Sequence, residues 1–150
     1  MTHPSKPLPP PIEAAYVALL TEMRNARARG DQAQIDAILA RAWELIPEPK
    51  IAYGRVHGTL DAMVSNFRDT GRVDEARRLL PTLREAFGVS VSAKAHVDFV
   101  EATVLLKSGS LDEAFALFDG LYRAYGRRPF QETDPAYLKF YLGRKAPAQR

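Results

Sequence analysis

The sequence predicts an all-α fold: a stack of three helix–turn–helix hairpins with a C-terminal capping helix. Three observations support this fold class. Glycines 30, 71 and 109, separated by 41 and 38 residues, each follow one apolar segment and precede another. Within these segments apolar residues recur three and four positions apart, which places them on one face of a helix. Residues typical of helix starts follow each glycine, so each copy has the form of one helical hairpin.

The repeated glycines are expected to end helices in the left-handed conformation, because glycine has no Cβ to clash there. Ser110 with Glu113 forms a capping box, and Asp31 with Gln34 is a close variant. The middle copy has Arg72 at the cap position. We therefore expect that helix to start more weakly.

The first hairpin follows a proline-rich segment. Residues 1–11 contain five prolines and are predicted to be a disordered tail. An SH3-type ligand is the alternative interpretation of this segment. A helix is predicted from near Ile12 to Arg29, and a second from Gln32 to Ile46, which Pro47 and Pro49 end. The first helix has an apolar face of Ile12, Tyr16, Leu19, Met23 and Ala26.

The second hairpin contains residues that disfavour helix. Its first helix is predicted from about Ile51 to Asp69 and carries Gly54 and Gly58 one turn apart. Either another helix or a partner approaches closely there, or the helix starts late. The next helix starts near Val73, and Pro81 within it predicts a kink or a break.

The third hairpin is predicted from Ser90 or Ser92 to Lys107, and from Leu111 to Tyr125. A final helix has Asp134 as its cap and Pro135 as its first residue, a favoured pairing. We expect it to cover the end of the stack. The predicted repeat domain thus comprises residues 12–142, with a frayed C-terminus over 143–150.

These hairpins resemble the tetratricopeptide repeat, whose pattern has a small residue at position 8, Ala at 20, a large apolar residue at 24 and often Pro at 32. The matching residues, from about Tyr16 to Tyr125, are Ala102, Ala114 and Phe118, then Val64, Ala76 and Leu80, then Leu39 and Pro47. The Trp of position 4 is absent, and the period exceeds that family's length of about 34 residues. A generic stack of α-hairpins is therefore the alternative.

The resemblance implies that a partner docks on the concave side, along the first helix of each pair. The positions that carry over as partner-binding are Arg24, Arg27, Asp61, Ser65, Arg68, His96, Phe99, Thr103 and Lys107. Phe99 is the expected aromatic anchor. The Lys and Asn set of the family's carboxylate clamp is absent. In the alternative interpretation these are ordinary solvated side chains.

The resemblance implies a non-catalytic adaptor, chaperone-like in size, that binds a protein or peptide, and the composition agrees with a non-catalytic role. The chain has no cysteine, which excludes disulfides and thiolate metal sites. It also has no glycine-rich nucleotide loop and no Gly-x-Ser-x-Gly elbow. We therefore expect no enzyme, no cofactor and no metal site; a phosphorelay histidine at His57 is the remaining catalytic hypothesis. Without an apolar leader or membrane span, a soluble cytoplasmic protein is expected. A homodimer is a further option.

The basic C-terminal end supports an alternative function. The whole chain has a net charge of +3, whereas residues 121–150 contain seven basic and two acidic residues, a net of +5. The aromatic residues interleaved with them are Tyr122, Tyr125, Phe130, Tyr137, Phe140 and Tyr141. Such a surface could bind single-stranded nucleic acid. The competing interpretation is a capping helix that buries these rings.

Overall fold

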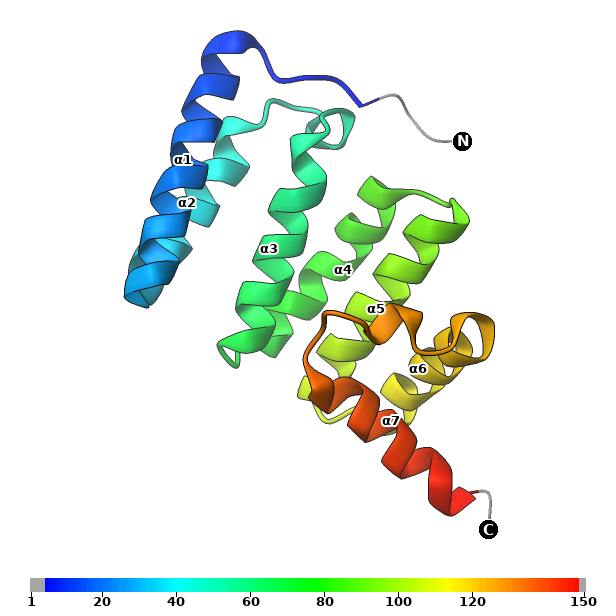
Figure 1. Cartoon of the computed structure of the whole chain (residues 1–150). Helices are drawn as coiled ribbons and strands as arrows, with labels where there is room; N and C mark the ends of the chain where they lie inside the picture. Colours follow the sequence, from blue (N-terminus) through cyan, green and yellow to red (C-terminus); the bar gives the residue numbers. More distant parts are fainter. Residues whose placement is uncertain (1–4, 149–150) are drawn as a thin grey trace. The chain divides into compact units, whose positions relative to one another are not determined.

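The computed structural model describes residues 5–148, with side chains described up to residue 145. This part of the chain forms seven α-helices and two short 3-10 helices and contains no strand (Figure 1). The prediction of an all-α protein is confirmed. The elements are α1 (Pro10–Arg29), α2 (Gln32–Leu45), η1 (Lys50–Ala52), α3 (Arg55–Asp69), α4 (Val73–Phe87), α5 (Val91–Lys107), α6 (Leu111–Tyr125), η2 (Arg128–Phe130) and α7 (Pro135–Ala148).

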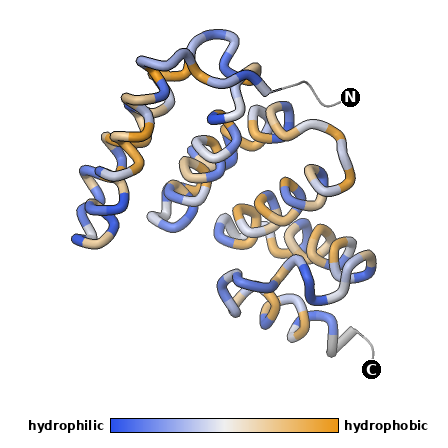
Figure 2. Tube along the Cα trace, turned by 45° about the horizontal axis from the view of Figure 1, so that its top comes forward, coloured by the Kyte–Doolittle hydropathy of each residue, from blue (hydrophilic) through white to orange (hydrophobic). Residues whose placement is uncertain are grey.

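The contacts within the chain divide it into two compact units, residues 1–66 and 67–150. The division falls inside α3, so the single domain predicted over residues 12–142 spans both units. Figure 2 shows hydrophobic and hydrophilic positions alternating along the helices, as expected where each helix buries one face.

The three repeated glycines end their helices in the same way, as predicted. Gly30, Gly71 and Gly109 have φ values of 64°, 80° and 85°. In each copy the residue after the glycine donates its N–H to the carbonyl five residues earlier, at 2.9, 2.8 and 2.9 Å. This bond satisfies a carbonyl that the end of the helix would otherwise leave unpaired.

The predicted helix caps are confirmed at three positions and wrong at one. The side chains of Asp31, Ser90 and Asp134 accept backbone N–H groups at 3.1, 3.2 and 2.9 Å. Ser110 makes no cap bond, so the capping box with Glu113 does not form. Both Asp31 and Ser110 have ψ below 90°. The carboxylate of Asp31 reaches an amide from this conformation, whereas the hydroxyl of Ser110 does not.

The first unit has its core where α1, α2 and α3 meet. The predicted face of α1 is buried at Tyr16, Leu19, Met23 and Ala26, and Ile12 is half-buried. The residues buried with them are Ile38, Leu39 and Ala42 from α2, and Val56, Thr59, Leu60 and Val64 from α3. The stripe read from the sequence is therefore the packed face of α1.

The N-terminal segment differs from the disordered tail predicted over residues 1–11. Residues 1–4 lie outside the described part. Lys6 donates its N–H to the carbonyl of Ala52 at 2.8 Å and accepts the N–H of Gly54 at 3.1 Å. Leu8 is buried, and Pro10 and Pro11 form the first turn of α1, where no backbone donor is required.

The late helix start, one of the two interpretations of the glycine pair, is confirmed. Helix α3 begins at Arg55, later than the predicted Ile51, so Gly54 precedes the helix. A Cβ on Gly54 would lie 3.4 Å from the Cβ of Ser5, which is ordinary contact with the N-terminal segment, and no described helix approaches this glycine closely. Gly58 lies inside α3, is exposed, and a Cβ added to it would have no atom within 4 Å.

The second unit packs α4, α5 and α6 in sequence and places η2 and α7 against α6. Helix α4 runs unbroken from Val73 to Phe87 through Pro81, so the predicted break into two pieces is wrong. The core cluster of this unit includes the rings of Phe118, Phe130, Tyr137 and Tyr141, with Phe99 packed against it. Helix α7 thus buries Tyr137 and Tyr141, leaves Phe140 half-buried, and extends to Ala148, beyond the predicted end at 142.

Candidate functional site

The first unit contains an open groove of about 330 Å³ between α1 and α3, with α2 at its base. We call it the α1–α3 groove. The side chains at the base are Ile38, Leu39 and Ala42; the walls include Leu19, Leu20, Met23 and Arg27 from α1, and Gly58, Thr59 and Ala62 from α3. Most of this surface is apolar. Leu20 lines the groove and still has 44% of its surface exposed.

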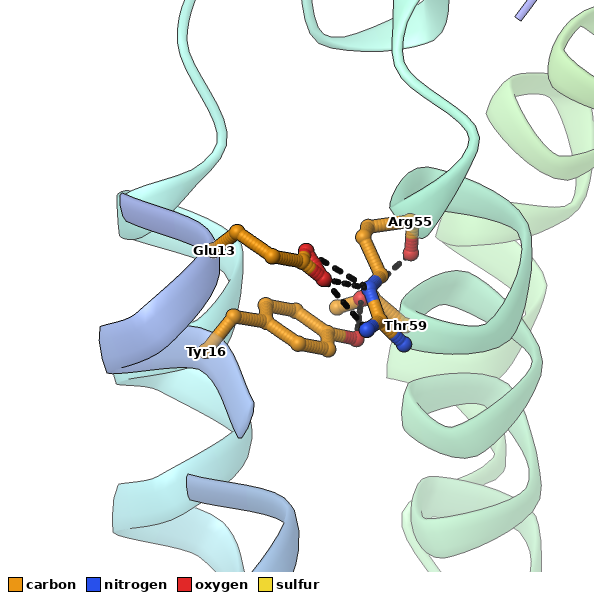
Figure 3. A network of polar contacts seen from close by, with 4 residues as sticks. All are labelled: Glu13, Tyr16, Arg55 and Thr59. Carbon is orange, nitrogen blue, oxygen red and sulfur yellow. Dashed lines mark hydrogen bonds and ion pairs between the residues drawn. The ribbon is translucent and has the colours of Figure 1, made fainter. Parts of the chain in front are cut away.

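A polar network joins α1 to α3 at one end of the groove (Figure 3). Nε of Arg55 donates to the carboxylate oxygens of Glu13 at 2.8 and 3.3 Å, and a second guanidinium nitrogen also donates to Glu13. The guanidinium lies over the ring of Tyr16, 4.8 Å from its centroid. The hydrogen bond to Glu13 raises the pKa of Arg55, despite an opposing effect of burial.

The hydroxyl of Tyr16 completes this network. It lies 2.6 Å from Oγ1 of Thr59, and Thr59 donates its own hydrogen to the carbonyl of Arg55 at 2.8 Å. Because a threonine hydroxyl has one hydrogen, Tyr16 is the donor in the first bond. Both side chains are at least 95% buried. The network therefore holds α1 at a fixed distance from α3 and closes this end of the groove.

The charge of the groove is positive. Within the described part of the chain, the charged side chains that line it are Arg27 and Arg55. Glu13 partly neutralises Arg55. Arg27 is exposed, and no carboxylate among residues 5–145 forms an ion pair with it. Arg24, also exposed, lies one turn earlier on α1.

The sequence-predicted docking residues of the first unit lie partly at this groove. Arg27 lines it, and Arg24 lies on the same helix outside the lining. Asp61 and Ser65 are half-buried on α3 and do not line the groove. Arg55 was not identified from the sequence, because its partner Glu13 is 42 residues away and no local pattern connects them.

Two of the docking residues predicted in the second unit are engaged in its interior. Thr103 is completely buried, and its hydroxyl accepts a hydrogen bond from Arg68 at 2.9 Å. The ring of Phe99 packs edge-on against Phe118, Phe130 and Tyr137 at 5.4 to 5.9 Å between centroids. A partner could not reach Thr103 without displacing this packing, whereas Phe99 is only half-buried.

Arg68, His96 and Lys107 have different surroundings. Arg68 pairs with Asp69 at 2.8 Å in addition to its bond to Thr103. The ring of His96 is exposed and stacks on Phe87 at 4.8 Å. Lys107 is exposed at the end of α5. Arg68 thus serves the interior of the second unit, whereas His96 and Lys107 present atoms to solvent.

The basic C-terminal end is neutralised in part by internal contacts. Arg144 pairs with Asp112, and Arg123 pairs with Asp119 at 2.9 Å. Lys145 lies over the ring of Tyr122, 4.9 Å from its centroid. Of the aromatic residues interleaved with these cations, Phe130, Tyr137 and Tyr141 are buried. Their faces are therefore not open to nucleic-acid bases.

Tyr141 and Asp119 form the central polar contact of this end. The hydroxyl of Tyr141 donates to Asp119 at 2.6 Å. Burial, with a smaller contribution from Asp119, raises the pKa of Tyr141 to about 12. The same hydrogen bond, helped by Arg123, lowers the pKa of Asp119. This contact stabilises the packing of α7 on α6.

The described residues contain no group of three or more His, Asp or Glu side chains that could hold a metal ion. None of the helices described is both long and apolar enough to cross a lipid bilayer. Comparison of the chain with models of protein families, with curated proteins and with solved structures gave no match.

Proposed function

We propose that this protein is a non-catalytic protein-binding adaptor that uses the α1–α3 groove. One observation carries the proposal: the groove is open and apolar, and a large apolar side chain, Leu20, remains 44% exposed in it. A folded chain gains by removing such surface from water, about 25 cal/mol for each Å². A bound partner would supply the missing cover.

The polar groups of the groove support binding over catalysis. The hydroxyls of Tyr16 and Thr59 are hydrogen-bonded to each other, and the guanidinium of Arg55 is hydrogen-bonded to Glu13. A catalytic site instead needs a nucleophile or base directed at an incoming substrate. Here the polar side chains fix the spacing of two helices.

The proposal includes the stacked-hairpin arrangement expected from the tetratricopeptide-like pattern. The common geometry of the turns at Gly30, Gly71 and Gly109 supports it, because equivalent turns build equivalent hairpins. In such an arrangement the first helices of successive hairpins, here α1 and α3, line one surface.

Gly58 offers a direct test of the groove. In Gly58→Leu the new side chain enters open space from α3, so it should fill the groove and raise helix propensity. Gly120→Leu is a matched control, since Gly120 is also exposed within a helix and its added Cβ would have no atom within 4 Å.

The measurement is affinity capture from native lysate with quantitative mass spectrometry, after circular dichroism has shown that both variants fold. We expect at least one protein to be recovered with the wild type and with Gly120→Leu, and lost with Gly58→Leu. Equal recovery of every protein by all three would refute the proposal.

A further inference from the structure

The α1–α3 groove combines an apolar interior with a positive rim. Its charged lining residues are Arg27 and Arg55, and Arg27 has no ion-pair partner among residues 5–145. An uncompensated cation beside an apolar surface attracts a ligand that carries negative charge next to an apolar group. A cationic ligand would meet repulsion at the same point.

The length of the groove limits what it can hold. Along α1 the lining runs from Tyr16 to Arg27, which corresponds to about 16 Å at the rise of an α-helix. Arg55 lies over Tyr16, so the two arginines are at opposite ends of this length. About five extended residues, or three turns of helix, would span it.

The open space over Gly58 is where an apolar side chain of a partner can enter the groove. Gly58 lies in the wall opposite Leu20, and a Cβ placed on it would touch nothing. The volume of about 330 Å³ lies near the lower limit of ligand pockets, about 300 Å³. It can therefore enclose one or two side chains of a partner.

We propose that the groove binds an acidic peptide segment of a partner protein. One large apolar side chain of that segment packs over Gly58 against Leu20 and Met23, and a neighbouring carboxylate pairs with Arg27. The inference rests on the proposed function and adds the chemistry of the partner. The bound carboxylate is that of a side chain within the segment.

A random 12-residue peptide library displayed on phage can test this. Selection is made on the wild-type protein, with parallel selection on Gly58→Leu and on Gly120→Leu. We expect sequences that are enriched on the wild type and on Gly120→Leu, absent from the Gly58→Leu pool, and combine Leu, Ile, Phe or Trp with Asp or Glu. If the peptides enriched on the wild type and on Gly120→Leu, but not on Gly58→Leu, are neutral or basic, the inference of an acidic partner is overturned while the binding function stands. If no enriched peptide is lost with Gly58→Leu, both the acidic-partner inference and the proposed binding function are refuted.

The role of Arg27 is tested with the most enriched peptide as a synthetic fluorescent probe. Arg27→Glu should weaken its binding about tenfold at low salt, and less at high ionic strength, since an exposed pair is screened. Arg78→Glu makes the same charge change on the exposed surface of α4 and should alter affinity less than twofold. Equal affinities of the two variants would overturn the assignment of Arg27.

A second copy of the chain is the competing occupant. Sedimentation of the wild type and of Gly58→Leu distinguishes it from a peptide. We expect the same mass for both proteins. A wild-type dimer that Gly58→Leu converts to a monomer would place a second copy in the groove and overturn the proposal.

Discussion

The hydrogen bond between Tyr16 and Thr59 should contribute measurably to the stability of the first unit. Thr59→Val keeps the shape of the side chain and removes the acceptor of the Tyr16 hydroxyl. Tyr16 is only 5% exposed, so its hydroxyl would lose its partner in a place that water hardly reaches. Leaving a buried donor unsatisfied costs about 1–3 kcal/mol.

Tyr16→Phe should cost less, about 1 kcal/mol, since Thr59 keeps its bond to the carbonyl of Arg55. In the double variant two apolar groups face each other and no donor is orphaned. Its loss of stability should therefore be smaller than the sum of the single losses by about 1 kcal/mol. This difference measures the interaction itself.

The assay is urea unfolding followed by tryptophan fluorescence. Trp43 is the single tryptophan of the chain and lies on α2, so its emission reports on the first unit. Far-UV circular dichroism of the same samples follows all helices and shows whether the units unfold together. Additive single losses, within about 0.3 kcal/mol, would refute the coupling of Tyr16 to Thr59.

Three further predictions concern other parts of the chain. Gly58→Ala should stabilise the first unit by about 1 kcal/mol in the same assay. Gly30→Ala, at a φ of 64°, should destabilise it by about 1 kcal/mol. A change of the same sign in both variants would contradict a helical conformation at Gly58 and a left-handed one at Gly30. The raised pKa of Tyr141 contributes stability that is complete below its unfolded value of 10.0 and is lost as the pH rises towards about 12. Tyr141→Phe should thus be about 1 kcal/mol less stable than the wild type near pH 8. This difference in stability should disappear by about pH 11, where the wild type alone loses about 1.4 kcal/mol. Urea unfolding followed by circular dichroism measures it, and a difference that stays constant with pH would show that Tyr141 titrates normally. Finally, Tyr125→Ala removes the most exposed ring of the basic end. It should change the affinity for a mixed single-stranded oligonucleotide less than twofold at low salt. A tenfold loss of affinity would favour the nucleic-acid alternative, because the stacking of one base on an aromatic ring contributes about 1–3 kcal/mol.

Features that depend on neighbours in the sequence could be predicted. The turns at Gly30, Gly71 and Gly109 need only a residue that accepts positive φ between two helical patterns. The buried stripe of α1 follows from spacing alone. The start of α7 at Pro135, with Asp134 as its cap, is equally local.

The contacts that define the groove connect residues far apart, and the sequence contains no sign of them. Arg55 meets Glu13 across 42 residues, and Tyr16 meets Thr59 across 43. Phe99 shows the opposite difficulty. Its position in the repeat pattern predicts an aromatic anchor for a partner, but its half-buried ring packs edge-on against Phe118, Phe130 and Tyr137. A helical pattern identifies which face is apolar and leaves open what covers it.

In the α1–α3 groove the polar network determines stability, whereas Gly58 determines whether a partner can enter. The binding hypothesis can therefore be tested without unfolding the protein. The network of Glu13, Tyr16, Arg55 and Thr59 connects α1 to α3, so changing it alters stability first. Gly58 touches nothing on its outer side and lowers helix propensity by about 1 kcal/mol relative to alanine. Filling this position should therefore raise stability and block binding together. Loss of fold cannot produce that combination, because an unfolded variant would lose both.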